Sequence, residues 1–216
     1  MAHHSITPVD LAARLHRIDA PRILDMRDDD DAASDPRRMP GACPIQLAEL
    51  ERMPIPAGPV ICTCQKGGKL SQLGAAILRA RGEVGRYLAG GHLAWVAGDL
   101  PLCDAGRPAA RWVVPCDPGW DELCALWVLR RLVDRDAPAM PVERDWRDAA
   151  AETWDARPLP ATPAEMATLA GLDHPILPRL AGGPARLVAG RLARGGDPVD
   201  ALDLVDDWVA APAIAA

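Results

Sequence analysis

Several features that mark common protein classes are missing from this sequence of 216 residues. A formal net charge of -6 gives no support for the basic face that nucleic-acid binding requires. No stretch resembles a signal peptide or a membrane-spanning segment, so the sequence predicts a cytoplasmic protein without a membrane partner. The six cysteines form no CxxC pair and have no regular spacing, which argues against a zinc site and against a secreted disulfide framework. We therefore expect no metal and a reducing compartment.

Lysine is also scarce, and its two positions are informative. Lys66 and Lys69 both follow Cys64 closely, whereas every position outside this segment that carries a permanent positive charge is arginine. The thiolate is the nucleophilic form of cysteine, and nearby cations and a helix N-terminus both favour it. The clustering of both lysines behind one cysteine therefore points to sulfur chemistry at Cys64.

A strand, a loop and a helix surround Cys64 in the predicted structure. Residues 60–63 read as a short buried strand, and Gly67 and Gly68 allow a tight loop. Apolar residues then recur at helical spacing, namely Leu70, Leu73, Ala76, Ile77 and Ala80. Backbone N–H groups in such a loop, with a helix N-terminus behind them, form an anion-binding site. The loop is predicted to hold a thiolate, a persulfide or an oxyanion.

The segment Cys64-Gln65-Lys66-Gly67-Gly68-Lys69 resembles the active-site loop of rhodanese-type sulfurtransferases, in which a cysteine opens a short loop and a basic residue closes it five positions later. Lys69 takes the closing position, where it keeps the charge but not the planar fork of the more frequent arginine. The related dual-specificity phosphatases have a loop one residue longer, with an arginine at the sixth position. Leu70 stands there and cannot donate bidentate hydrogen bonds to a phosphoryl group, which favours sulfur over phosphate.

Three further segments agree with this resemblance: residues 23–27, residues 38–42, and residues 88–95 together with 100–102. The resemblance covers roughly the first half of the chain. It implies an α/β fold over residues 1–105, with a rhodanese-like parallel sheet flanked by helices.

Residues near the loop leave alternatives open. Asp25 and Arg27 follow a strand at its carboxyl end, where parallel sheets place their ligand crevice. They belong either to the site, by bracing the loop and binding substrate, or to an ordinary structural ion pair. His92 either assists proton transfer near Cys64 or is a cap or surface residue. Cys62 is either a small core residue or a resolving thiol.

The resemblance implies a sulfurtransferase. Its cysteine thiolate attacks the outer sulfur of a small anionic donor such as thiosulfate, and the persulfide then passes this sulfur to cyanide or to a thiol acceptor, which is a small molecule or a protein. No metal or organic cofactor is required. The alternative is an oxyanion-responsive regulatory or resistance accessory protein that binds chromate or sulfate without turnover. The predicted catalytic residues are Cys64 and Lys69, and the predicted substrate-binding residues are Gln65, Lys66, Gly67, Gly68, Asp25 and Arg27.

The second half of the chain differs in composition and is predicted to form a smaller, mainly helical domain over residues 111–216. A polar segment at 104–108, which contains Gly and Pro, reads as the linker. Residues 111–115 read as a short strand. Helix starts are predicted at 162–165 and at 197–200, because each has a capping residue followed by proline and an acidic residue.

Residues 111–114 and 121–134 resemble the start of the chromate-resistance protein domain, which is known to follow rhodanese-like domains in fused proteins. The resemblance is degenerate, because Ala125-Leu126 stand in place of the family's Cys-Pro pair. Arg130-Arg131 are predicted to lie on a solvated helix face or to contact an oxyanion or a partner.

Overall fold

The computed structural model describes residues 4–54, 58–104 and 110–211 of the chain. The predicted linker at 104–108 lies almost entirely outside the described residues. The chain divides into two compact units, Met1–Gly106 and Arg107–Ala216, and each unit has its own parallel sheet. None of the helices in the described ranges is long and apolar enough to cross a membrane.

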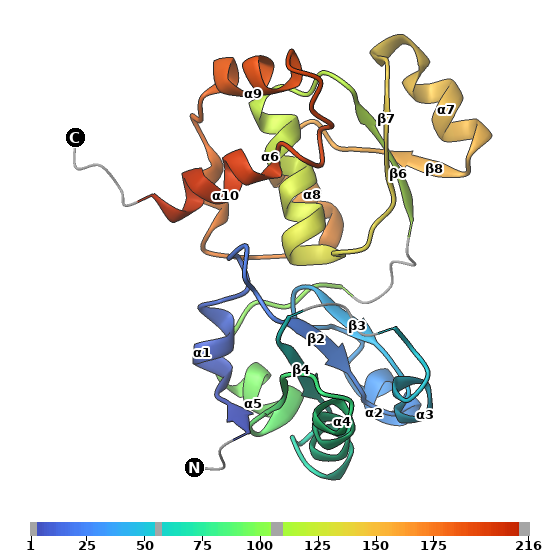
Figure 1. The fold of residues 1–216 in the computed structure, drawn as a ribbon, viewed down its shortest axis with the longest axis vertical. Coiled ribbons are helices and arrows are strands. Elements are labelled where there is room, and N and C mark those ends of the chain that lie inside the picture. The colour runs from blue at the N-terminus through green and yellow to red at the C-terminus, as the bar shows by residue number, and fades with distance from the viewer. Residues whose placement is uncertain (1–3, 55–57, 105–109, 212–216) are drawn as a thin grey trace. The chain divides into compact units, whose positions relative to one another are not determined.

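The first unit is an α/β domain with a five-stranded parallel sheet flanked by helices, which confirms the predicted fold class (Figure 1). The strand order is β1-β5-β4-β2-β3, so β4 is central. The strands are β1 (Ser5–Ile6), β2 (Arg22–Asp25), β3 (Ala42–Pro44), β4 (Val60–Thr63) and β5 (Gly85–Leu88). The helices are α1 (Pro8–Ala12), α2 (Asp29–Ser34), α3 (Leu47–Leu50), α4 (Lys69–Ala80) and α5 (Gly91–Ala97). Helices α1 and α5 contact each other, as do α3 and α4.

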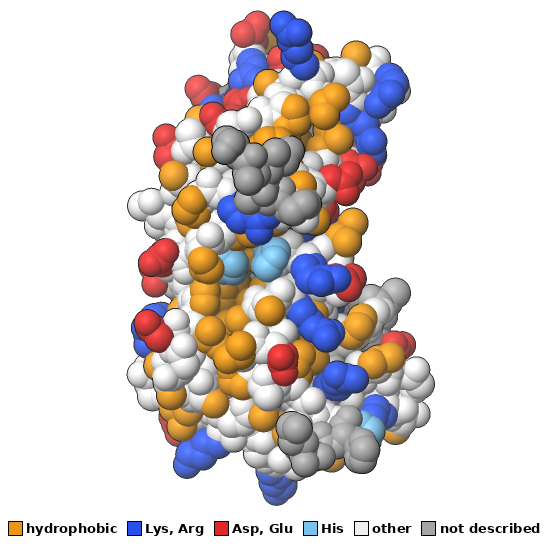
Figure 2. Space-filling model, turned by 90° about the vertical axis from the view of Figure 1, so that its left-hand side faces the viewer, with side chains coloured by type: hydrophobic (Ala, Val, Ile, Leu, Met, Phe, Trp, Pro, Cys, Tyr) orange, Lys and Arg blue, Asp and Glu red, His pale blue; other side chains and the backbone are white. Residues whose placement is uncertain are grey.

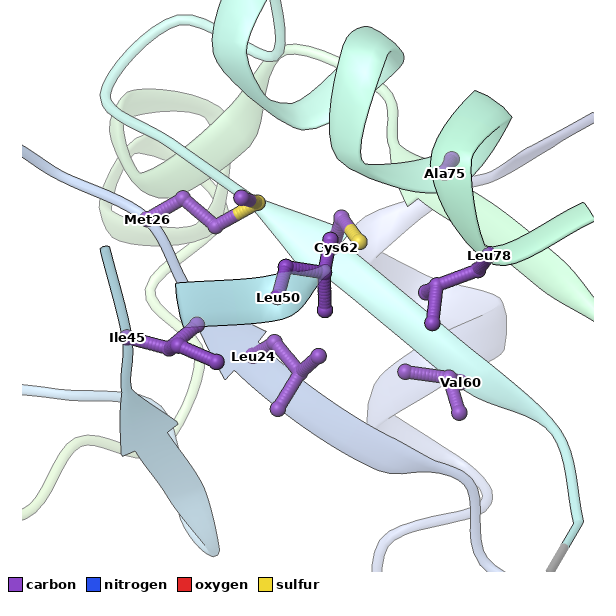
Figure 3. Packing of buried hydrophobic residues seen from close by; sticks show 8 residues of the cluster. All are labelled: Leu24, Met26, Ile45, Leu50, Val60, Cys62, Ala75 and Leu78. Atoms are coloured by element: carbon purple, nitrogen blue, oxygen red, sulfur yellow. The ribbon is translucent and has the colours of Figure 1, made fainter. Parts of the chain in front are cut away.

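A hydrophobic core packs strands β2 and β4 against α3 and α4 (Figure 3). Its buried members are Leu24, Met26, Ile45, Leu50, Val60, Cys62, Ala75 and Leu78. Cys62 is fully buried among them, which confirms the interpretation of Cys62 as a core residue. Burying apolar surface of this kind is the dominant favourable contribution to folding.

The predicted helix after the loop is confirmed as α4, but its most buried residues are not the ones that carry the apolar spacing. The spacing rests on Leu70, Leu73, Ala76, Ile77 and Ala80, whereas the buried residues are Ser71, Gly74, Ala75 and Leu78, and Leu73 is 43% exposed. The physical reason is the close approach of α4 to the sheet. A Cβ on Gly74 would lie 2.5 Å from Met26 Sδ and 3.1 Å from Cys62 Sγ. The side of α4 that packs against the sheet is therefore determined by small residues and not by the spacing of apolar residues.

Because three thiols are buried, we expect the folded structure to lose stability at high pH. Burial raises the pKa of Cys62, of Cys103 and of Cys124 to about 12 each. Because thiols of the unfolded chain ionise near about pH 8.5, the folded chain holds more protons between about pH 8.5 and 12. Stability from this source is complete below about pH 8.5 and falls as the pH rises toward about 12.

The Cys62→Ala variant tests this expectation. We expect the free energy of unfolding in urea to depend less steeply on pH, by roughly 1.4 kcal/mol per pH unit above about pH 9. Cys43→Ala, which removes an exposed thiol, is the control and should leave the slope unchanged. Equal slopes for wild type and Cys62→Ala would contradict the prediction.

The second unit is mainly helical, with a three-stranded parallel sheet in the order β7-β6-β8 (Figure 1). The strands are β6 (Arg111–Pro115), β7 (Ala139–Val142) and β8 (Ala156–Pro158). The α-helices are α6 (Trp120–Val128), α7 (Arg147–Thr153), α8 (Pro163–Ala170), α9 (Ala185–Leu192) and α10 (Leu202–Ala210). A π-helical turn (Leu129–Val133) extends α6, and short 3-10 helices cover Arg144–Trp146 and Leu177–Leu180.

Of the two predicted helix starts, one is confirmed and one is wrong. The side chain of Thr162 accepts a hydrogen bond from the N–H of Glu165 and caps α8, with Pro163 at its first position. Asp197 instead accepts a hydrogen bond from the N–H of Val199 at 2.7 Å. This bond closes a local turn, and α10 begins only at Leu202.

Large hydrophobic side chains are also exposed, and Figure 2 shows hydrophobic and charged side chains interspersed on one face. The exposed ones include Val9, Ile18, Leu73, Val84, Leu93, Trp146, Trp154, Leu187 and Trp208. Scattered apolar residues of this kind are normal on protein surfaces and by themselves indicate no binding site.

Candidate active site

Cys64 lies at the carboxyl end of the central strand β4, the edge at which parallel sheets bind ligands. Only 6% of the residue is exposed, but the sulfur has a polar neighbour. The thiol donates to Ser71 Oγ at 3.3 Å, and the Ser71 hydroxyl donates to the carbonyl of Gly68 at 3.2 Å. Ser71 is the third residue of α4, so the sulfur lies at the first turn of this helix. Sequence reasoning missed Ser71, because this polar residue is not one of the apolar residues at helical spacing.

The peptide groups after Cys64 are oriented by α5. The carbonyls of Cys64 and Gln65 accept hydrogen bonds from the N–H groups of His92 (2.9 Å) and Leu93 (3.0 Å). In a trans peptide the N–H points opposite to the C=O, so the N–H groups of the two following residues point away from α5. Among the described residues, the N–H groups of positions 65–69 have no hydrogen-bond acceptor. Such a run of free donors is an anion-binding arrangement.

Two glycines make this arrangement possible. A Cβ on Gly67 would lie 2.5 Å from the carbonyl oxygen of Leu88, and Gly67 has a φ of +64°. A Cβ on Gly91 would lie 2.1 Å from the carbonyl oxygen of Cys64 and 2.3 Å from the nitrogen of Gly67. The loop and the start of α5 are therefore in backbone contact. Gly68, in contrast, has open space where its Cβ would be.

The two lysines are exposed, one in the loop and one at the first position of α4. Neither Lys66 nor Lys69 has an ion-pair partner within 4 Å among the described residues. Both ammonium groups are therefore free to attract an anion. Gln65 is half-buried, and its Oε1 is buried without a hydrogen-bond partner in the described structure.

Asp25 and Arg27 form a buried ion pair, with Arg27 Nη2 2.8 Å from Asp25 Oδ2. The guanidinium also donates to the carbonyls of Asp35 (2.7 Å) and Arg37 (2.9 Å). Each nitrogen of the Arg27 guanidinium therefore has an acceptor within the protein. The predicted substrate contact by these two residues would require the pair to open, whereas bracing fits the pair as it stands.

His92 is fully buried, so the interpretation as a surface residue is wrong. Its Nε2 lies 3.0 Å from Asp35 Oδ2, and its backbone N–H is the donor to the Cys64 carbonyl. The pKa of the Asp35 carboxyl lies well below its usual range, mainly because Arg37 donates to it, with a smaller contribution from His92 against the cost of burial. Sequence reasoning missed Asp35, because its partner His92 lies 57 positions away in the chain.

No group of three or more metal-ligating side chains occurs in the described residues. The structure thus offers Cys64 a set of backbone donors, two free ammonium groups and one hydroxyl. This set can stabilise negative charge on sulfur or on a small oxyanion.

Arg130 and Arg131 both have partners inside the second unit. Arg131 Nη2 lies 2.7 Å from Asp206 Oδ2, and Trp127 Nε1 donates to Asp206 Oδ1 at 2.7 Å. Arg130 Nη1 donates to the carbonyl of Ala137 at 2.6 Å. Both residues are partly exposed and have partners within the unit.

No family model and no curated protein matches this chain. The resemblance of the second half to the chromate-resistance protein domain therefore stays a prediction.

Several solved structures are similar to the N-terminal part of the chain. A rhodanese-related protein from Thermoplasma volcanium is 20% identical over 46% of this chain and 97% of that chain, with a TM-score of 0.40. A thiosulfate sulfurtransferase from Pseudomonas aeruginosa is 29% identical over 46% of this chain and 19% of that chain, with a TM-score of 0.40. A rhodanese homolog from the extremely thermophilic bacterium Thermus thermophilus is 25% identical over 42% of this chain and 98% of that chain, with a TM-score of 0.34. The chemistry of Cys64 has to be judged from the residues around it.

Proposed function

We propose that the chain is a sulfurtransferase that carries a sulfane sulfur on Cys64. The observation that carries this proposal is the position of the Cys64 sulfur at the first turn of α4, at the start of five consecutive backbone N–H groups without acceptors. Donors of this kind favour a thiolate and a persulfide anion over their neutral forms.

The proposed reaction has two steps. The Cys64 thiolate attacks the outer sulfur of thiosulfate, a new S–S bond forms, and sulfite leaves with the electron pair of the broken S–S bond. An acceptor thiolate or cyanide then attacks the outer sulfur of the persulfide, and the Cys64 thiolate is released. No oxidant, metal or organic cofactor takes part in this cycle.

Each residue of the loop has a role in this proposal. Lys66 and Lys69 attract the anionic donor as point charges, and the N–H groups of the loop stabilise the negative charge on sulfur. Once the thiol proton is lost, the Ser71 hydroxyl can turn from the Gly68 carbonyl and donate to the sulfur. The small exposed fraction of Cys64 favours a small donor.

Mass measurement after incubation with thiosulfate tests the proposal. We expect the intact wild-type protein to gain the mass of one sulfur atom, and Cys64→Ser to gain none. Cys43→Ser, which removes an exposed cysteine elsewhere in the first unit, is the control and should gain sulfur like the wild type.

A different outcome would favour the second candidate function. The same free donors and ammonium groups can bind an oxyanion without reacting with it. Saturable binding of sulfate or chromate, together with no sulfur gain on Cys64, would contradict the sulfurtransferase and support the regulatory or accessory protein.

A further inference from the structure

A chain of hydrogen bonds leads from the Cys64 loop to a residue 29 positions earlier in the sequence. The Cys64 carbonyl accepts from the backbone N–H of His92 at 2.9 Å, and the His92 ring meets the Asp35 carboxylate at 3.0 Å. A carboxylate can only accept, so the ring proton shared with Asp35 is on Nε2. The N-terminal turn of α5 is thus tied to the loop by its backbone and to Asp35 by a side chain.

The Asp35 carboxylate is the one polar partner of the buried His92 ring within the described residues. His92 Nδ1 is buried without a hydrogen-bond partner, and the residue has no exposed surface. The imidazole therefore depends on Asp35 for its orientation. Removing the carboxylate would leave the whole ring without a polar contact, an arrangement that buried polar groups avoid.

Asp35 is itself held rigidly. Arg37 donates to both of its carboxylate oxygens, from Nε at 2.8 Å and from Nη2 at 2.9 Å. Arg27 donates to the main-chain carbonyl of Asp35 at 2.7 Å. Asp35 thus connects the buried Asp25–Arg27 pair at the end of β2 to the start of α5.

We propose that Asp35 is a positioning residue for the Cys64 loop, acting through His92. It holds the first turn of α5 in register, so that the N–H groups of His92 and Leu93 keep the first two loop carbonyls turned toward α5 and the N–H groups of the two following residues turned away from it. This inference rests on the proposed function, because the orientation of these N–H groups affects catalysis only if they stabilise negative charge at Cys64. Misplacement of reacting groups by about 1 Å can cost on the order of 10²-fold in rate, and we expect Asp35→Ala to slow sulfur loading by about that factor.

The test compares two alkylating agents of similar size, iodoacetate and iodoacetamide, on Cys64. The free N–H groups of residues 65–69 attract the anionic reagent. Cys64 of the wild type should therefore prefer iodoacetate over iodoacetamide more strongly than a free thiol such as glutathione does. Asp35→Ala and His92→Ala should each reduce this preference, leaving only the part that the Lys66 and Lys69 ammonium groups supply. Asp30→Ala, which removes an exposed carboxylate of α2, is the control and should keep the wild-type preference. Peptide mass spectrometry assigns the alkylation to Cys64.

If a variant were only less stable, its unfolded molecules would react with both reagents as a free thiol does. The preference of its folded molecules for iodoacetate would stay at the wild-type value. If Asp35→Ala fails to fold, Asp35→Asn replaces it, because the amide keeps the size but loses one acceptor oxygen. In the double variant Asp35→Ala/His92→Ala, the preference should fall no further than in either single variant, because the two act as one unit. A folded Asp35 variant with wild-type preference would overturn the inference alone. If the wild type prefers iodoacetate no more than glutathione does, the Cys64 loop does not attract anions. That result would overturn both this inference and the proposed function.

Discussion

Replacing Gly91 by alanine is expected to reduce sulfur loading of Cys64 by at least about 10²-fold. The new Cβ would lie 2.1 Å from the carbonyl oxygen of Cys64 and 2.3 Å from the nitrogen of Gly67. Both are backbone atoms, so no side chain can turn aside and the loop itself has to move. The Cys64 and Gln65 carbonyls would then lose the hydrogen bonds that orient them. The rate of sulfur gain from thiosulfate, measured by intact mass, checks this prediction.

Gly82→Ala is the matched control for Gly91→Ala. Gly82 also has a positive φ, +86°, but its Cβ would meet nothing within 4 Å. Both variants therefore force alanine into a left-handed conformation, which costs about 1–2 kcal/mol, and only one of them intrudes on the loop. We expect both to lower the unfolding midpoint and only Gly91→Ala to slow sulfur loading. Similar loading rates in the two variants would show that the contact between α5 and the loop is dispensable.

The part of the site that the sequence predicts correctly is local. The buried strand at 60–63, the loop that Cys64 opens and the helix that follows it are predicted from a short apolar run, two glycines and a periodic segment; the structure begins the helix at Lys69, one residue before the periodic segment. Neighbouring residues alone determine these features. The same reasoning does not identify the most buried residues of α4, because that face depends on how closely Gly74 allows the helix to approach Met26 and Cys62.

The parts that the sequence does not predict depend on contacts between distant residues. His92 and Asp35 are 57 positions apart, and Trp127 and Asp206 are 79 apart. No local pattern indicates such pairs. Strands β7 and β8 were also missed, since each contains a proline that reads as a loop signal. Both are edge strands of the second sheet, where proline is tolerated.

Replacing Arg27 by methionine is expected to lower the free energy of unfolding by about 3–5 kcal/mol. The Asp25 carboxylate is 4% exposed and would remain buried without its partner. The carbonyls of Asp35 and Arg37 would lose their donors as well. Urea unfolding of the wild type and the variant measures the loss.

The exposed pair of Arg17 and Asp19 provides the control. It has the same spacing in the sequence and the same 2.8 Å separation as the buried pair, but its side chains are 59% and 66% exposed. Water solvates both groups when such a pair is broken, so Arg17→Met should leave stability nearly unchanged. A comparable loss in both variants would mean that burial does not set the cost at Arg27.

The double variant Asp25→Leu/Arg27→Met separates bracing from substrate contact. Removing both charges leaves no unpaired buried carboxylate, so stability should recover relative to Arg27→Met. If the pair only braces the loop, the double variant should need the same thiosulfate concentration as the wild type for half-maximal loading, whatever its loading rate. If Arg27 also contacts the donor, the double variant should fold stably and yet require a higher thiosulfate concentration for half-maximal loading. The second result would restore the predicted substrate-binding role of Asp25 and Arg27, and it would show that the pair opens when the donor binds.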